Sequence, residues 1–142
     1  MGRNNSGKYD FEVMAPVGSF ESLMAAIQGG ADSVYFGAEK LNMRSRSSSN
    51  FTTDDLLEIV SIAKKHKVKT YLTINTVLYD SDLSVMRSLI DAAKESGISA
   101  VIVSDQAAIN YANSIDVEVH ISTQVNISNI EALKFYSHFA DV

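Results

Sequence analysis

The sequence predicts an α/β protein in which about five parallel strand–helix units form part of a (β/α)8 barrel that does not close within this chain. Strand-like and helix-like segments alternate from about residue 11 to the end of the chain. The strand expected at 100–103 is apolar on successive residues, which is typical of a parallel strand covered on both faces. An open doubly wound sheet fits the same periodicity. However, no G-x-G-x-x-G follows the first strand, so a dinucleotide-binding sheet loses support.

The first two strands are expected at 11–14 and 33–36, with a helix between them. Ser19 is well placed to cap this helix because its side chain can accept backbone N–H groups. Apolar side chains then recur at helical spacing, at Phe20, Leu23, Met24 and Ile27. The second strand is followed by a connection of roughly fourteen residues, longer than usual, and long ordered loops are often functional.

The remaining units follow without a linker that would separate two domains. Thr52 and Asp55 resemble a capping box at the start of the second helix, and His66 is expected at its end. A strand at 69–73 precedes a helix that ends near Gly97. The last two strands are expected at 100–103 and 118–121, with helices at 105–114 and 126–138. The final helix carries the apolar stripe Ile127, Ile130 and Leu133.

The composition predicts one soluble globular domain, because 142 residues with 46% hydrophobic and 20% charged residues suffice for one core. We expect residues 1–10 to be a disordered lead-in and residues 11–142 to be the domain. No apolar run is long enough to span a membrane. The opening residues 1–7 are polar and lack the apolar stretch of a secretory signal, so we expect a cytoplasmic protein. The net charge of −5 argues against nonspecific nucleic-acid binding by this stretch.

The chain has no cysteine, which excludes a disulfide, a thiolate zinc site, a cysteine nucleophile and iron–sulfur ligands within this stretch. The histidines His66, His120 and His138 lack metal-ligand spacing, so no metal site is expected. Neither a nucleophile elbow nor a zincin motif is present.

Polar residues concentrate where the strands end, and function gathers at the carboxyl ends of strands in either fold. The expected substrate-binding residues are Asn42, Arg44, Asn75, Asp105, Ser122 and Gln124. His120, flanked by apolar residues, is the candidate for acid or base catalysis.

Each of these residues also has a structural interpretation. Arg44 can bind an anion or belong to a solvated basic loop. A satisfied core histidine is favoured for His120, and a helix cap is favoured for Asp105. The amides of Asn75 and Gln124 can orient a substrate or connect adjacent loops by hydrogen bonds, and neither interpretation is favoured over the other.

The strand ends also carry a family resemblance over about residues 11–142. The motifs are Ala15-Pro16-Val17-Gly18-Ser19, Gly30-Ala31-Asp32-Ser33-Val34-Tyr35-Phe36-Gly37, Asn42-Met43-Arg44, Asn50-Phe51-Thr52, Thr73-Ile74-Asn75-Thr76, Val103-Ser104-Asp105 and His120-Ile121-Ser122-Thr123-Gln124. Together they resemble the N-terminal region of the U32 peptidase, or collagenase-like, family. Two departures bear on ligand choice: Val17 replaces a usual alanine, and the serine run Ser45 to Ser49, broken by Arg46, replaces a more basic or alanine-rich stretch.

The resemblance implies a TIM-barrel-like region that further strands and a cysteine-bearing segment continue in full-length members. Some members are classed as peptidases with collagenase activity. Others resemble oxygen-independent hydroxylation factors for tRNA, ribosomal RNA or ubiquinone, with an iron–sulfur cluster and, in RNA cases, prephenate. By resemblance, Asn42 and Arg44 line the barrel mouth, where Arg44 holds a substrate carboxylate.

Three functions follow as hypotheses. The first is part of an RNA-hydroxylation-type or related enzyme with a small anionic, prephenate-like substrate, and with RNA as a partner of the full-length protein. The second is a collagenase-like peptidase acting on peptides. The third is a truncated, non-catalytic module. We expect the isolated stretch to be inactive and to self-associate through the open edges of its first and fifth strands.

Overall fold

Five parallel strands form one sheet in the order β1-β2-β3-β4-β5 in the computed structural model, which describes residues 11–39, 41 and 51–142. The strands are β1 (Met14–Pro16), β2 (Ser33–Gly37), β3 (Lys69–Ile74), β4 (Ala100–Val103) and β5 (Val119–Ile121). The helices are α1 (Phe20–Gln28), α2 (Leu56–Lys65), α3 (Leu83–Ser96), α4 (Gln106–Ser114) and α5 (Ile130–Tyr136), with 3-10 turns η1 (Thr53–Asp55), η2 (Asp80–Asp82) and η3 (Thr123–Val125). The predicted fold class is confirmed: parallel βα units follow one another around a sheet that stays open within the described residues.

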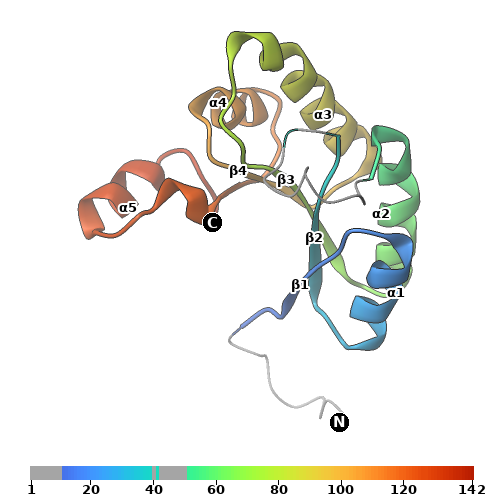
Figure 1. Ribbon diagram of the computed structural model, residues 1–142. Helices are drawn as coiled ribbons and strands as arrows, with labels where there is room; N and C mark the ends of the chain where they lie inside the picture. The colour runs from blue at the N-terminus through green and yellow to red at the C-terminus, as the bar shows by residue number, and fades with distance from the viewer. Residues whose placement is uncertain (1–10, 40, 42–50) are drawn as a thin grey trace.

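Helices α1 to α4 cover the outer face of the curved sheet, and consecutive helices pack against each other (Figure 1). The core lies between this helical layer and the sheet. Its strand side chains are fully buried and alternate along the strands: Val34 and Phe36 on β2, Leu72 and Ile74 on β3, and Val101 and Val103 on β4. The intervening strand residues therefore face the opposite, inner side of the sheet.

Local signals in the sequence set several helix ends as predicted. The Ser19 hydroxyl accepts the Ser22 N–H at 3.2 Å and begins α1. The carboxylate of Asp55 accepts the N–H of Thr52 at 2.7 Å. Gly97 ends α3 with a φ of 81°, a left-handed conformation in which glycine has no side-chain penalty.

The first strand lies further along the chain than predicted. It begins at Met14 rather than at residue 11, because pairing with β2 starts at Met14 opposite Ser33. Phe11 and Val13 are 68% and 47% exposed, so the apolar run before the strand is not buried. Pairing, which periodicity does not reveal, decides where this strand starts.

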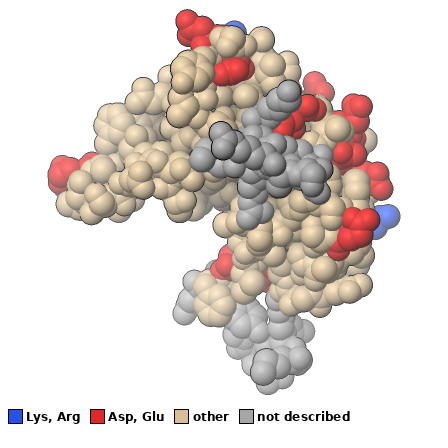
Figure 2. All heavy atoms as spheres, in the orientation of Figure 1, with Lys and Arg blue, Asp and Glu red and all other residues tan. Residues whose placement is uncertain are grey.

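The prediction for the last helix is wrong in its length and its packing. Asn126 adopts a left-handed φ of 55° and Asn129 caps the helix, so α5 begins only at Ile130. The apolar side chains expected to be buried are exposed instead, with Ile130 at 59% and Leu133 at 52%. Figure 1 shows α5 projecting away from the sheet, and Figure 2 shows that this projecting part carries few charged side chains on the visible face.

The outer edge of β5 is occupied by the last residues of the chain. Val142 donates its N–H to the carbonyl of Val119 at 3.3 Å and accepts the N–H of Ile121 at 2.7 Å. These two hydrogen bonds flank His120 and have the pattern of a parallel strand pair. The expectation of an unpaired edge at the fifth strand is therefore wrong at this point.

Candidate functional site

A cavity of about 420 Å³ lies on the inner face of the sheet. Strand residues that line it, such as Tyr35 and Thr73, alternate with Val34 and Leu72, which are buried against the helices. The full lining is Met14, Tyr35, Gly37, Thr73, Asn75, Ile102, His120, Ile121, Ser122, Thr123, Gln124 and Val142. All five strands or the residues next to them contribute, so the parallel topology brings distant parts of the sequence into one cavity.

Asn75 and Ser122 join the carboxyl ends of β3 and β5. The Asn75 amide donates from Nδ2 to the Ser122 hydroxyl at 3.4 Å, across 47 residues of sequence. Ser122 is held in place because its backbone N–H donates to the carbonyl of Val103 at 2.8 Å. The backbone N–H of Gln124 also donates to the Ser122 hydroxyl, at 3.3 Å. The structure thus brings three of the predicted site residues together.

Thr73 lines the same cavity two residues before Asn75, on the same side of β3. Its side chain is only 8% exposed, and its hydroxyl has no hydrogen-bond partner among the described residues. A buried hydroxyl without a partner is unfavourable, commonly by about 1–3 kcal/mol. The wall of the cavity therefore contains a buried hydroxyl that no hydrogen bond within the described residues compensates.

His120 lines the cavity from the middle of β5. Its Nε2 lies 2.8 Å from the Glu118 carboxylate, and its side chain is 12% exposed. The ring also lies against the ring of Tyr71, with centroids 4.8 Å apart. The favoured interpretation of a satisfied histidine fits these contacts, although the residue remains in the cavity wall.

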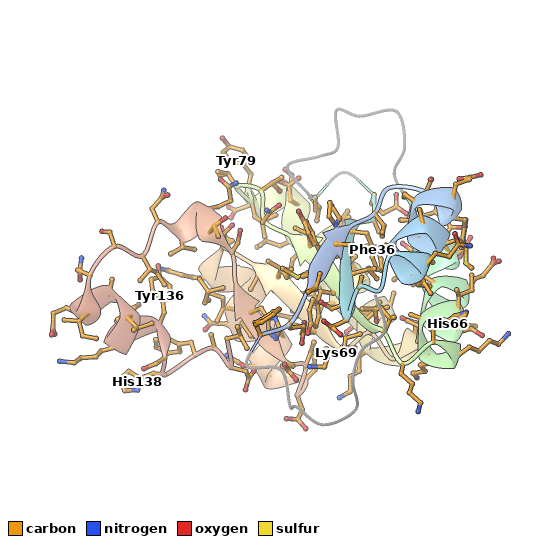
Figure 3. All side chains as sticks on the ribbon, turned by 90° about the horizontal axis from the view of Figure 1, so that it is seen from below. Phe36, His66, Lys69, Tyr79, Tyr136 and His138 are labelled. Carbon is orange, nitrogen blue, oxygen red and sulfur yellow. The ribbon has the colours of Figure 1, made fainter. Side chains whose placement is uncertain are left out.

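A second polar cluster lies at the amino end of the strands. The Tyr71 hydroxyl donates to one oxygen of Glu12 at 2.7 Å, and Lys69 donates to the other at 2.9 Å. Partial burial alone would raise the pKa of Glu12, but the hydrogen bonds from Tyr71 and Lys69 lower it to about 2. Burial, and then the hydrogen bond to Glu12, raise the pKa of Tyr71 well above its usual value. Figure 3 places Lys69, in this cluster, at the opposite end of the strands from Tyr79, which follows β3.

The sequence analysis missed this cluster. The sequence predicts Glu12 and Tyr71 only as members of the strands expected at 11–14 and 69–73. The available signal was alternation: Tyr71 and Thr73 are two residues apart on β3, and His120 on β5 is two residues after Glu118, which directly precedes that strand. Polar residues at such spacing in otherwise buried strands indicate an inner face.

Asp105 caps α4, because its carboxylate accepts the Ala107 N–H at 2.8 Å. The cap interpretation is confirmed, and Asp105 is not among the residues that line the cavity. Asn42 and Arg44 lie outside the described residues, so their predicted roles stay predictions.

No group of three or more His, Asp or Glu side chains within the described ranges has the geometry of a metal site. His66, directly after α2, and His138, beyond α5, lie on opposite flanks of the molecule (Figure 3). The 142 residues also include no cysteine, which an iron–sulfur cluster requires, so this chain's residues do not fit such a cluster. Within the described residues, no helix is both long and apolar enough to cross a membrane.

A curved parallel sheet with outer helices and a cavity on its inner face defines a protein of the (β/α) barrel class. Residues 18–140 match the sequence model of peptidase family U32, and the chain belongs to that family.

Two relatives carry different functional names. The chain is 68% identical to a collagenase of Porphyromonas gingivalis over 133 residues, which cover 94% of this chain and 32% of the relative. It is 33% identical to tRNA hydroxylation protein P1 of Bacillus subtilis over 127 residues, covering 88% of this chain and 30% of that protein. The chain thus spans about a third of the length of either relative.

The fold comparison agrees with the family. The structure of the U32 peptidase Mk0906 superimposes with a TM-score of 0.74, covering 99% of this chain and 60% of that one. Sequence identity is only 13%, so this likeness concerns the fold alone.

Proposed function

We propose that this chain is the N-terminal part of a cytoplasmic RNA-hydroxylation-type or related enzyme and forms a pocket for a small anionic substrate. The observation that supports this proposal is the shared cavity, in which Asn75, Ser122 and Gln124 meet at the carboxyl ends of the strands. Active sites of (β/α) barrels gather at that end. No acidic side chain is among the described residues of the cavity wall, which leaves the pocket open to an anion.

Arg44 is the proposed contact for the substrate carboxylate, and Asn42 is a further proposed substrate-binding residue. An arginine offers two parallel N–H donors to a carboxylate, which a lysine does not. A small carboxylate such as prephenate suits a cavity of about 420 Å³ better than an extended peptide does. Names of relatives in tRNA hydroxylation point in the same direction.

His120 is the proposed catalytic residue. It contacts Glu118, and a carboxylate beside an imidazole fixes the ring orientation and tautomer. Asp105 is the weakest member of the proposed substrate-binding set, because its carboxylate is engaged in capping α4. Any iron–sulfur cluster of a longer protein would use cysteines outside this sequence, and no role of the present residues depends on one.

The test is a calorimetric titration of this chain with prephenate. Wild-type protein is expected to bind, and Arg44→Ala to weaken binding by about tenfold or more, because a charge-assisted bidentate contact is lost. Arg87→Ala is the matched control, because it changes the net charge by the same amount as Arg44→Ala but lies on α3, away from the cavity. Absence of wild-type binding, or equal loss in both variants, would contradict the proposal.

A collagenase-like peptidase is the alternative, and the 68% identity to the Porphyromonas gingivalis collagenase favours it. The described geometry gives a serine peptidase little support, because the Ser122 hydroxyl contacts Asn75 and Gln124 rather than an imidazole base. Cleavage of denatured collagen by the full-length protein, lost on His120→Ala, would establish the alternative. A third proposal, a non-catalytic module, predicts neither prephenate binding nor cleavage.

A further inference from the structure

The imidazole of His120 uses only one of its two ring nitrogens within the described residues. Its Nε2 lies 2.8 Å from a carboxylate oxygen of Glu118, and Nδ1 makes no hydrogen bond there. Among the described residues, the buried side-chain nitrogen and oxygen atoms that lack a hydrogen bond are limited to the hydroxyls of Ser33 and Thr73. Nδ1 is therefore open to solvent, on a side chain that is otherwise largely buried and lines the cavity.

The carboxylate of Glu118 determines which ring nitrogen carries the proton. An ionised carboxylate only accepts hydrogen bonds, and a neutral imidazole has one N–H donor and one acceptor nitrogen. In the neutral ring, the 2.8 Å contact therefore places the proton on Nε2 and the lone pair on Nδ1. Glu118 directly precedes β5 and Ser122 directly follows it, so the carboxylate belongs to the amino end of the strand, whereas Ser122 and the cavity residues after it belong to the carboxyl end.

Tyr71 packs against the imidazole from β3. The two ring centroids are 4.8 Å apart, with 53° between the ring planes. Tyr71 is itself buried, and its hydroxyl donates to Glu12 at 2.7 Å. Because the carboxylate of Glu118 is 52% exposed, its pairing with His120 alone would restrain the ring only weakly, and the packed Tyr71 ring adds a second restraint. The cluster at the amino end of the strands is thus connected to the cavity wall through these two rings.

We infer that Glu118 is a positioning residue, which holds the Nε2–H group of His120 and thereby keeps the Nδ1 lone pair for a hydroxyl group of a molecule in the cavity. This inference rests on the proposed function, in which His120 is the catalytic residue, and it assigns the reacting atom. A proton that leaves the hydroxyl goes to Nδ1, and the electron pair of the broken bond stays on the oxygen. The imidazolium that forms remains paired with the carboxylate of Glu118.

Long-range proton–nitrogen NMR spectra test this assignment, because protonated and unprotonated ring nitrogens have well separated shifts. The chain has three histidines, and His120→Gln identifies the signals of His120 by their loss. At about pH 9, where imidazoles are neutral, His120 is expected to be protonated on Nε2 alone. The exposed His66 and His138 are expected to show averages of the two tautomers. Averaged shifts for His120, or a proton on Nδ1, would overturn the inference.

Two substitutions of Glu118 test its part in the arrangement. Glu118→Ala removes the acceptor, so the His120 shifts are expected to become averages like those of His66. Glu118→Gln keeps an acceptor oxygen at the same reach and is expected to restore the single tautomer. A tautomer of His120 that stays single in Glu118→Ala would overturn the positioning role.

Two controls separate positioning from general effects on the fold. Glu131→Ala removes an exposed carboxylate from α5 and should leave the His120 signals unchanged. Tyr71→Phe keeps the ring against the imidazole but loses the hydrogen bond to Glu12, so it should lower the melting temperature without changing the tautomer. A change of tautomer in Tyr71→Phe equal to that in Glu118→Ala would show that lost stability, rather than the lost acceptor, is the cause.

Prephenate, which carries a ring hydroxyl, separates this inference from the proposed function. In protein saturated with prephenate, the Nδ1 signal of His120 is expected to shift more than the Nε2 signal. Prephenate binding that depends on Arg44 but leaves Nδ1 unmoved would overturn the inference and leave the proposed pocket standing. A single tautomer that depends on Glu118, in a protein that does not bind prephenate, would support the positioning role and contradict the proposed function.

Discussion

At the scale of single residues, Glu12 shows how the inner side of the sheet is stabilised away from the cavity. Its two carboxylate oxygens receive hydrogen bonds from Tyr71 and Lys69, both on β3. These contacts tie the segment before β1 to a strand two positions away in the sheet. Because they favour the ionised carboxylate, they lower its pKa to about 2.

This shift predicts acid sensitivity. The folded-state pKa of Glu12 lies below its ordinary value of 4.5, so the contribution of its charge to the free energy of unfolding is complete above about pH 4.5 and is lost as the pH falls towards 2. Because 35% of the Glu12 side chain is exposed, solvent screening weakens its charged contacts. We expect the ionised carboxylate to contribute about 1 kcal/mol to the free energy of unfolding. Urea unfolding of the wild type and Glu12→Gln at pH 7 and pH 3 would measure it.

The expected result is that Glu12→Gln is less stable than the wild type at pH 7 and that the difference narrows at pH 3. Glu131→Gln removes a carboxylate from an exposed pair with Lys134 on α5 and is the control. A difference between wild type and Glu12→Gln that stays constant with pH would show that the charge of Glu12 is unimportant.

Residue roles at the strand ends were partly predictable. The rule that parallel strands end at one edge was enough to group Asn75, Ser122 and Gln124, which line one cavity. It could not reveal that Asn75 donates to Ser122, or that Thr73 lacks a partner, because both depend on the register and side-chain directions in three dimensions.

At the scale of secondary-structure elements, the helices differ in how much they contribute to the core. The buried faces of α2 and α3 each include residues with at most 3% exposure, such as Ile59 and Ile90. Helix α5 has no fully buried residue: Ile130, Leu133 and Phe135 are exposed, and Tyr136 is half-buried where it packs against the core. The apolar periodicity of a helix therefore predicted its amphipathic character but not its burial.

A matched pair of leucine substitutions tests this difference. Leu72→Ala, at a fully buried position on β3, is expected to lower the free energy of unfolding by about 2–5 kcal/mol, because it leaves a cavity. Leu133→Ala, at a position 52% exposed on α5, is expected to change it by no more than about 0.5 kcal/mol. Chemical denaturation measures both. A comparable loss in the two variants would mean that Leu133 is buried in the core.

Element boundaries were predictable only where a local residue sets them. Gly97 and Asp105 ended and began helices as their chemistry suggested. The start of β1 depends on its pairing with β2, and the start of α5 on the backbone conformation at Asn126. Neither is encoded in the spacing of apolar residues.

At the scale of the whole molecule, the sheet edges are less available for pairing with another chain than the sequence predicts. Val142 occupies part of the β5 edge. On β1, the N–H of Val17 bonds to β2, so by alternation the nitrogen of Pro16 faces outwards, where it has no hydrogen to donate. Both features hinder pairing with another chain at these edges.

Self-association stays a prediction, but the exposed apolar face of α5 is now its expected site, with a second copy of the chain as the partner. Light scattering during size-exclusion chromatography is expected to show a mass that rises with concentration. Leu133→Glu should suppress this rise, whereas Leu57→Glu, at an exposed position on α2, should not. A mass that stays monomeric in the wild type would contradict the prediction.

Overall charge also sets an expectation for partners. The net charge is −5, and Figure 2 shows acidic side chains outweighing basic ones on the visible face, mainly over the helical flank. Phosphate backbones are repelled by such a surface. If the full-length protein acts on RNA, its basic contacts are expected from parts of the protein beyond this acidic flank.

The account depends above all on the parallel strands bringing Asn75 and Ser122 to the same end of the sheet. The chain has no cysteine, so the double variant Asn75→Cys/Ser122→Cys contains two thiols and no others. A short bifunctional methanethiosulfonate reagent can link these two thiols if they lie close together. We predict rapid cross-linking of the two thiols within a monomer, and no intramolecular cross-link in Asn75→Cys/Ser88→Cys. Slow or purely intermolecular cross-linking of the first pair would contradict the arrangement of the strands.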